Sequence, residues 1–555
     1  MSKLKGYEYI GETLKANGTT HVFYEELAFF YSTKEMRKYG ITPVLAHSEE
    51  AAGYMADGYA RASNKIGVCM SQSIGAANLA ASVHDAWLGN TPVLAMTGFK
   101  QDNAYQKGGY QESNHRAHFS GVTKYNETTY DAQQLPFLLS QAIREATTGK
   151  PRPVHLDVIG YAGEVAEKAE MNANFVPEPG FASIPAFRPA ADPEAVKKAA
   201  EMINAAERPV FVAGRGALIS DPDGKVLYEM ATKADVPVCT TPDGKTIISE
   251  YDPLWGGVVG GYGMACANHI TTDSDLVVYI GSMVSDQTTL AFTAPPLDRQ
   301  IIHIDIDGRE LGKNYKNTFG LQGDARTVME QLLPLIEKKD RKDWRDKAAA
   351  YVAKSLKELD DMSGETVPVQ TGRLCQEISK ALPDDAIVVA DTGWSATWAD
   401  VAIRMKDTQK YMRAAGSLGW SFPASIGAKC ACPDRPVFNF SGDGAFYYHL
   451  SELESSVRNG IKVIVILNNN SHFNQCIPYV SEAYEDDPEG FEVYAEKVKF
   501  EPTDFVGIAK SFGADGEKVT DSADIGKAIE RAMASDVSYV INVITDPSCA
   551  PIITF

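Results

Sequence analysis

An aspartate between two glycines and a run of asparagines are the residues of this 555-residue chain that point most directly to chemistry. Asp443 stands between Gly442 and Gly444 and is followed by Ala445. Glycines let a backbone approach a diphosphate closely, and the carboxylate can hold a divalent cation that bridges the diphosphate oxygens. The asparagines at 468–470 follow an apolar strand, where an amide oxygen can complete the shell of the cation. The sequence therefore predicts a metal and diphosphate site.

The residues between these two motifs are the elements that would position them. Apolar side chains recur with helical spacing over residues 446–457, and Gly460 stands where a helix C-cap belongs. Residues 462–467 have the composition of a buried parallel strand. The N-terminus of the expected helix then points at Asp443, which suits a diphosphate. Either motif alone could be an ordinary turn or strand end, but together they favour the site.

Together these features resemble the thiamin diphosphate (ThDP) binding motif, and the wider sequence resembles the acetolactate synthase and benzoylformate decarboxylase superfamily. The resemblance covers essentially the whole chain. It implies that an aspartate, the second asparagine of a pair and the backbone carbonyl two residues later ligate Mg²⁺. On this spacing the ligands are Asp443, Asn470 and His472. Because three asparagines are consecutive, Asn469 is the alternative to Asn470.

Two upstream segments match further parts of the same family pattern. The glycine-rich stretch at 416–427 resembles the loop and helix in which a bulky apolar residue wedges between the two cofactor rings. Leu418 matches that residue, and the carbonyl of Gly416 would accept a hydrogen bond from the aminopyrimidine. The alternative for this stretch is a glycine-rich turn before a core helix. Asp391 and Thr392 follow an expected strand and match another loop on the diphosphate side.

ThDP reacts only after its thiazolium C2 loses a proton, and a buried carboxylic acid bonded to the pyrimidine drives this step. Residues 47–61 resemble the family segment that opens with the activating glutamate, and Glu49, nine positions before Gly58, matches it. For Glu50 we prefer the alternative of an exposed acid near a helix N-terminus. The resemblance also implies that Gly75 and Asn78 shape the turn beside the cofactor. Asn78 could equally be a helix N-cap.

The residues that would select the substrate match the family less closely. Gln111 resembles a glutamine that reaches the reacting carbonyl in acetolactate synthases. His115 and His118 could donate protons locally, or could be helix-packed and surface histidines. Tyr24 and Glu25 fall where acetolactate synthases carry a glycine- and proline-containing loop. They either face the substrate or start a helix, and this departure argues against true acetolactate synthesis from two 2-oxo acids.

The resemblance implies a ThDP- and Mg²⁺-dependent enzyme that makes or breaks a C–C bond next to a carbonyl, through an enamine. Its small-molecule substrate would be a 2-oxo acid, an aldehyde or a ketone. The alternatives are a lyase or hydrolase of acyloins or cyclic diketones, and an FAD-linked oxidase. A central domain without FAD is favoured, because the Gly-x-Gly at 214–216 is a weak signal. Glu49 of one subunit would meet Asp443 of another, which implies a homodimer as the smallest active unit and a homotetramer as the assembly.

Composition limits the other function classes. The formal net charge of −20 argues against a nucleic-acid surface. The sequence contains no run of about 18 apolar residues, so we expect no membrane span. Eight cysteines without a tight repeated spacing, and an opening segment without the apolar core of a secretion signal, predict reduced thiols and a cytoplasmic location.

The alternation of strand and helix patterns predicts three doubly wound α/β domains with parallel sheets. We expect an N-terminal pyrimidine-binding domain at 1–165, a central Rossmann-like domain at 190–340 and a C-terminal diphosphate- and Mg-binding domain at 365–555. A proline- and alanine-rich linker and a charged helical connector separate them. The expected strands are 21–23, 66–70, 92–97, 154–158, 209–213, 276–280, 301–306, 386–390, 437–440, 462–467 and 539–544.

Overall fold

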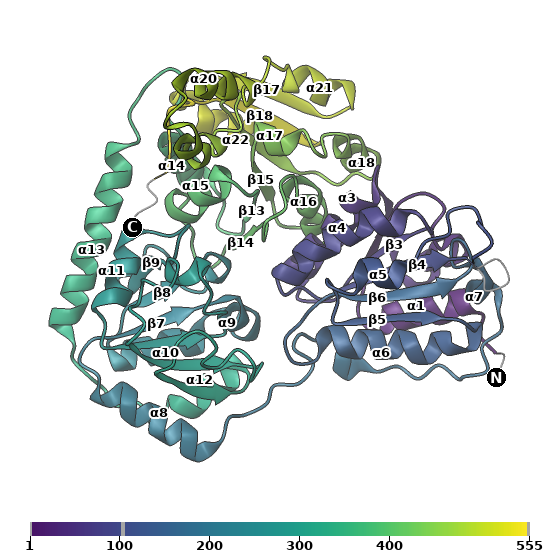
Figure 1. Ribbon diagram of the computed structural model, residues 1–555, viewed down its shortest axis with the longest axis horizontal. Coiled ribbons are helices and arrows are strands. Elements are labelled where there is room, and N and C mark those ends of the chain that lie inside the picture. Colours follow the sequence, from purple (N-terminus) through teal and green to yellow (C-terminus); the bar gives the residue numbers. More distant parts are fainter. Residues whose placement is uncertain (1–2, 101–105, 552–555) are drawn as a thin grey trace.

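The computed structural model describes residues 3–100 and 106–551 and contains three parallel sheets of six strands, each flanked by helices (Figure 1). The predicted fold class, three α/β units with doubly wound parallel sheets, is confirmed. Within the described residues, no helix has both the length and the apolar character that crossing a bilayer requires.

The N-terminal sheet has the strand order β2-β1-β3-β4-β6-β5. Its strands are β1 His21–Tyr24, β2 Thr42–Leu45, β3 Gly67–Ser71, β4 Val93–Phe99, β5 Tyr125–Thr129 and β6 Val154–Ile159. Its helices are α1 Gly6–Ala16, α2 Phe30–Glu35, α3 Glu49–Ser63, α4 Gly75–Leu88, α5 His115–Phe119, α6 Leu135–Thr147 and α7 Glu164–Lys168. Every residue of β3 is buried, as a strand covered on both faces should be.

The central sheet has the order β12-β11-β10-β7-β8-β9, which is the Rossmann order when its strands are numbered from one. Its strands are β7 Pro209–Ala213, β8 Val238–Thr240, β9 Trp255–Val258, β10 Leu276–Ile280, β11 Gln300–Asp305 and β12 Thr318–Gln322. Its helices are α8 Pro193–Ala205, α9 Arg215–Ser220, α10 Lys225–Ala234, α11 Ala265–Asp273 and α12 Ala325–Leu332. The long helix α13 Lys342–Asp361 is the charged connector to the last domain.

The C-terminal sheet has the order β14-β13-β15-β16-β18-β17, which repeats the strand order of the N-terminal sheet. Its strands are β13 Ile387–Ala390, β14 Lys410–Arg413, β15 Val437–Gly442, β16 Ile464–Asn469, β17 Asp515–Val519 and β18 Tyr539–Ile544. Its helices are α14 Thr371–Ala381, α15 Trp394–Ala402, α16 Ser421–Ala431, α17 Asp443–Phe446, α18 Glu452–Arg458, α19 Cys476–Ser481, α20 Pro488–Lys497, α21 Phe505–Ser511 and α22 Ile525–Ala534.

One predicted element differs. The single helix expected over residues 446–457 is two short helices, α17 and α18, joined by a turn. In that turn the backbone N–H groups of Tyr448 and Glu452 bond to carbonyls three residues back, which tightens the chain and interrupts the α-helical pattern.

Helices α3 and α16 cross at backbone contact and join the N-terminal domain to the C-terminal domain of the same chain (Figure 1). A Cβ placed on Gly58 would lie 2.1 Å from the carbonyl oxygen of Ala424, and one on Gly427 would lie 1.8 Å from that of Met55. Real Cβ atoms do not approach so closely, so this crossing requires glycine at both positions.

A buried charge cluster lies beside the crossing. The Arg61 guanidinium donates to Asp57 at 2.7 Å and to Asp85 at 3.2 Å. Asp85 also accepts the backbone N–H of Ser417 at 2.8 Å, and Trp420 Nε1 donates to Asp57 at 2.8 Å. Buried charges are tolerated when they are paired and hydrogen-bonded, and removing one partner is costly. The cluster therefore fixes α3 to the loop that precedes α16.

We expect Gly58→Ala to destabilise the protein by about 1–3 kcal/mol, because the added methyl group forces α3 away from α16. Gly526→Ala is the matched control. Gly526 lies inside α22 with open space at the Cβ position, so alanine should leave stability unchanged or raise it by about 1 kcal/mol. Thermal unfolding midpoints measure both effects, and equal midpoints for the two variants would contradict the close crossing.

Candidate active site

A cavity of about 140 Å³ opens where strands β15 and β16 end. Ligands of parallel sheets bind at the carboxyl ends of the strands, so its position suits a ligand site. Several sequence-predicted residues line this cavity together: Thr392, Leu418, Gly442, Asp443, Gly444, Ala445, Asn470 and His472. We call it the Asp443 cavity.

Asp443 is a buried acid without a counter-ion. Its side chain is 3% exposed, and it accepts the backbone N–H of Gly444 at 2.7 Å and that of Ser471. Burial raises the pKa of the carboxyl to about 7, although these N–H groups oppose the shift. Within the described residues no basic side chain pairs with it. A carboxylate in this state, next to amide oxygens, suits a hard divalent cation such as Mg²⁺.

The structure separates the two candidate asparagines. Asn470 lines the cavity, whereas the amide of Asn469 donates to Asn542 at 2.9 Å inside the domain. Ser471 has a φ of 57°, and this left-handed turn lets both Asn470 and His472 reach the cavity. The Asn470 side-chain oxygen accepts the backbone N–H of His472 at 3.1 Å. Any metal here would use one carboxylate with amide and carbonyl oxygens, because the described residues contain no cluster of three His, Cys, Asp or Glu side chains able to hold one.

Close packing leaves no room for a side chain at Gly444 and little room at Gly442. A Cβ on Gly444 would lie 2.4 Å from the ring of Phe473, and one on Gly442 would lie 3.1 Å from the hydroxyl of Ser395. Gly444 therefore lets the segment after β16 pack over the loop, a role that the sequence motif alone did not reveal. The glycines, the acid and the amide together fit a cation-bound diphosphate.

Asp391 lies behind the cavity and does not line it. This fully buried carboxylate accepts backbone N–H groups from Thr392 at 2.9 Å, Gly419 at 3.0 Å and Ser421 at 2.9 Å. Burial raises the pKa of its carboxyl, and these hydrogen bonds oppose the shift. Asp391 thus holds the two loops that present Thr392 and Leu418 to the cavity.

Gly416 also lies outside the lining of the Asp443 cavity. Its backbone N–H donates to Asp85 of the N-terminal domain at 3.0 Å. The charge cluster beside the α3–α16 crossing therefore positions this residue, two residues before Leu418.

A second group of predicted residues surrounds Glu49, which begins α3 and is 8% exposed. The amide of Asn78 donates to the Glu49 carboxylate at 3.1 Å. A Cβ on Gly75 would lie 2.3 Å from the same carboxylate, so glycine leaves room for it. Asn78 is not the N-cap of α4, because that position is Ile74. Both residues therefore position the glutamate directly.

Gln111 belongs to the same group. Its side-chain oxygen accepts the backbone N–H of Ile74 at 3.3 Å, and its carbonyl accepts the hydroxyl of Ser73 at 2.7 Å. Tyr161, which the sequence interpretation missed, joins the group: its carbonyl accepts the backbone N–H of Ser73 at 3.1 Å, and its ring stacks on that of Tyr110. No motif marked Tyr161, because its position depends on contacts between distant segments.

Glu25 faces this group, and the two histidines do not join it. Burial raises the pKa of Glu25, and the negative charge of Glu49 raises it further. Tyr24 ends β1, and α2 begins only at Phe30, so neither Tyr24 nor Glu25 starts a helix. His115 is buried with its Nδ1 2.9 Å from Asp157, and His118 is exposed.

The Asp443 cavity and the Glu49 group lie apart within one chain. Glu49, Gly75, Asn78 and Gln111 do not line the cavity. Each half has large exposed apolar side chains beside it. Ile74 is 48% exposed and Tyr110 71% exposed next to Gln111, and near the cavity Tyr448 is 57% exposed and Tyr479 67% exposed. The sequence-predicted site residues therefore form two groups within one chain.

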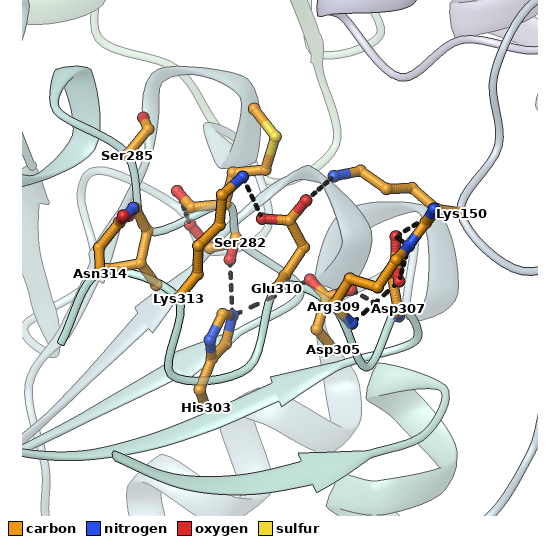
Figure 2. A network of polar contacts seen from close by, with 12 residues as sticks. Lys150, Ser282, Ser285, His303, Asp305, Asp307, Arg309, Glu310, Lys313 and Asn314 are labelled. Atoms are coloured by element: carbon orange, nitrogen blue, oxygen red, sulfur yellow. Dashed lines mark hydrogen bonds and ion pairs between the residues drawn. The ribbon is translucent and has the colours of Figure 1, made fainter. Parts of the chain in front are cut away.

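A further cavity of about 160 Å³ borders the central domain. Figure 2 shows the polar network at one end, where Lys150 of the N-terminal domain pairs with Glu310 at 3.0 Å and His303 bonds to the Ser282 carbonyl at 2.9 Å. Sites for drug-sized ligands typically measure about 300–1,000 Å³. This cavity lies below that range, and a central domain without FAD stays a prediction.

Three parts of the chain match the thiamine pyrophosphate (TPP) enzymes. Residues 4–118 match the N-terminal TPP binding domain, residues 196–332 the central domain and residues 391–543 the C-terminal TPP binding domain. A probable acetolactate synthase large subunit of Methanocaldococcus jannaschii is 30% identical over 562 residues, covering 98% of this chain and 92% of the relative. This chain belongs to the thiamine pyrophosphate enzyme family.

Other relatives of this TPP enzyme have similar names. The acetolactate synthase isozyme 1 large subunit of Escherichia coli K12 is 30% identical over 493 residues, covering 87% of this chain and 83% of the relative. The acetolactate synthase large subunit of Haemophilus influenzae is 26% identical over 550 residues, covering 96% of this chain and 93% of the relative. The resemblance to the acetolactate synthase-like group is confirmed, and with it thiamin diphosphate as the cofactor of an enzyme that acts on C–C bonds.

We expect Asn470→Ala to weaken Mg²⁺-dependent ThDP binding at least about tenfold, because the cation loses an oxygen ligand next to Asp443. Asn459→Ala is the matched control, since Asn459 caps α18 in the same domain and does not line the cavity. Fluorescence titration of ThDP at fixed Mg²⁺ measures both affinities. Equal affinities for the two variants would remove Asn470 from the metal site.

Proposed function

We propose that this enzyme uses ThDP and Mg²⁺ to make or break a C–C bond next to a carbonyl group, at a site that two copies of the chain complete. One observation carries the proposal: each chain holds a metal and diphosphate half around Asp443 and an acid half around Glu49, and the two lie apart. The substrate is a 2-oxo acid, an aldehyde or a ketone.

In the metal half, Asp443, Asn470 and the backbone carbonyl of His472 hold Mg²⁺. The burial of Asp443 without a counter-ion supports this role, because a cation compensates the charge that burial disfavours. Leu418 and Thr392 line the cavity, where Leu418 would pack against the cofactor and Thr392 would help to hold its diphosphate. Asp391 keeps both residues in position through its three backbone hydrogen bonds.

In the acid half, Glu49 holds a proton at the pyrimidine, and Gln111 orients the carbonyl of the substrate. Bound ThDP supplies a carbanion that adds to a carbonyl carbon. Asn78 and Gly75 fix the position of the Glu49 carboxylate, so that the carboxyl group holds its proton at a single position. The surrounding apolar and aromatic side chains exclude water when a second copy covers them.

A twofold dimer would complete the site. The Asp443 cavity, at about 140 Å³, is below the usual volume of a small-molecule site, as expected of half a site. A symmetric interface brings the same two patches together twice, so Glu49 of each copy meets Asp443 of the other. The exposed Ile74, Tyr110, Tyr448 and Tyr479 supply apolar surface for such an interface. The assembly is then a homodimer at least, and we propose a homotetramer.

Glu25 favours a reaction other than acetolactate synthesis. Its side chain brings a second acid close to Glu49. We infer that a half-site with two acids disfavours the carboxylates of two 2-oxo acids. Like charges repel strongly in a partly buried site. A 2-oxo acid decarboxylase or carboligase with one charged substrate is the first candidate. A lyase or hydrolase of uncharged acyloins or cyclic diketones is the second, and the acidity of this half-site favours it.

We further propose a cytoplasmic location. All eight cysteines are free, and five of them are buried: Cys69, Cys239, Cys266, Cys375 and Cys430. Thiols that serve as core residues are typical of proteins kept in a reducing compartment.

We expect Glu49→Gln to retain ThDP and Mg²⁺ binding but to lower turnover about 100-fold or more, because the amide cannot supply the proton. Glu50→Gln should keep near-normal turnover, since Glu50 accepts the Tyr54 hydroxyl, which an amide oxygen can still accept, and its contact with His449 is long at 3.9 Å. Turnover is measured on a panel of 2-oxo acids, acyloins and cyclic diketones, with CO₂ and carbonyl products recorded together.

This panel also decides the reaction class. CO₂ released from a 2-oxo acid identifies a decarboxylase or carboligase, and turnover without CO₂ identifies the lyase or hydrolase. Full activity of Glu49→Gln would contradict the assignment of the acid half.

A further inference from the structure

A cavity of about 440 Å³ lies where the three domains meet, away from both half-sites. Its walls come from the end of α3, from α9 and the start of α10, and from β14 with the loop before it (Figure 1). The volume falls within the usual range for small-molecule sites. Five basic side chains line it: Arg61, Arg215, Lys225, Lys410 and Arg435.

Arg215 is a half-buried cation without an ion pair in the described chain. Its Nη1 donates to the carbonyl of Gly89 at 2.8 Å and to the hydroxyl of Thr91 at 3.1 Å. Burial lowers the pKa of Arg215 to about 10, and the positive charge of Arg61 acts in the same direction. The guanidinium is still charged at neutral pH, and only one of its nitrogens has hydrogen-bond partners among the described residues.

Lys410 and Arg435 form a second cationic part of the wall. Lys410 donates to the carbonyl of Ala62 at 2.7 Å, and Arg435 donates to the carbonyls of Asp385 at 2.6 Å and Thr408 at 2.8 Å. Neither forms an ion pair within the described residues. Burial lowers the pKa of Lys410, and the charge of Arg435 adds to this effect. Two cations thus stand side by side with only carbonyl dipoles to compensate them.

The other two cations in the wall have carboxylate partners. Arg61 is already neutralised by two buried carboxylates, and Lys225 pairs with Asp223 at 2.7 Å. Asp243 and Asp407 are the other acids in the wall. Arg215, Lys410 and Arg435 are therefore the cations of the wall that have no ion pair among the described residues.

We propose that this cavity binds a small molecule through an oxyanion, a phosphate or a carboxylate group, held by Arg215, Lys410 and Arg435. Guanidinium groups bind such oxyanions with two parallel hydrogen bonds, and a half-buried cation without a partner is stabilised when an anion reaches it. Because the wall includes the last turn of α3, whose first residue is Glu49, the anion would also join the three domains of one chain.

The test is calorimetric titration of ThDP-loaded protein, dialysed free of excess Mg²⁺, with inorganic phosphate and separately with malonate. We expect saturable binding of at least one probe, weakened about tenfold, or about 1.4 kcal/mol, in Lys410→Gln and in Arg215→Gln. Binding of phosphate alone assigns a phosphorylated ligand, and binding of malonate alone assigns a carboxylate. Because ligand binding favours the folded protein, the bound probe should also raise the thermal unfolding midpoint.

Lys406→Gln is the matched control, because Lys406 lies in the same loop, is exposed and pairs with Asp384 outside the cavity. Its affinity for the probe should stay within about twofold of the parent, a difference below 0.5 kcal/mol. Unfolding midpoints measured without the probe show whether each variant is folded. If Lys410→Gln does not fold, Arg215→Gln provides the test. The proposal is overturned if neither probe binds at millimolar concentration, or if both cavity variants bind as the parent does.

Discussion

The close crossing of α3 and α16 is the constraint on which the arrangement of this enzyme depends. Gly58 and Gly427 bring the two helix backbones into contact, and the buried Arg61 cluster fixes the crossing. The crossing places the N-terminal and C-terminal sheets, which share one strand order, against each other within a chain. Glu49 lies outside the Asp443 cavity, and on our proposal a single chain presents two separate halves of a site.

Each half is organised by hydrogen bonds to a carboxylate. Asp391 orders the loops on either side of the Asp443 cavity, and Asp443 itself remains without a counter-ion. Glu49 is positioned by the amide of Asn78 and by the space above Gly75. Such fixed polar groups need little reorganisation when charge develops during a reaction. This is the physical basis for proposing ThDP chemistry across two copies.

The sequence predicted the inner strands well and the edge strands poorly. Inner strands such as β7 and β10 are apolar along their length because helices cover both faces. All six edge strands were missed: β2, β5, β9, β12, β14 and β17. Strands at an edge, such as β17 with the sequence Asp-Gly-Glu-Lys-Val, keep polar side chains and lack a continuous apolar run.

In the candidate site, too, some residues could be predicted from the sequence and others could not. The motif residues Asp443, Asn470 and Leu418 could be predicted because their spacing is local, and the structure brings them together in one cavity. The position of Asp391 behind the loops and the approach of Tyr161 to Gln111 depend on segments far apart in the chain. No pattern in a single sequence encodes those contacts.

The claim that two copies share each site is tested most directly by mixing two inactive variants, Glu49→Gln and Asp443→Ala, after dissociation and reassembly. If Glu49 of one copy serves Asp443 of the other, half of the random dimers carry one intact site, and about a quarter of the parental activity returns. Activity that stays at the level of the separate variants, while mixed dimers are shown to form, would contradict a site shared between copies.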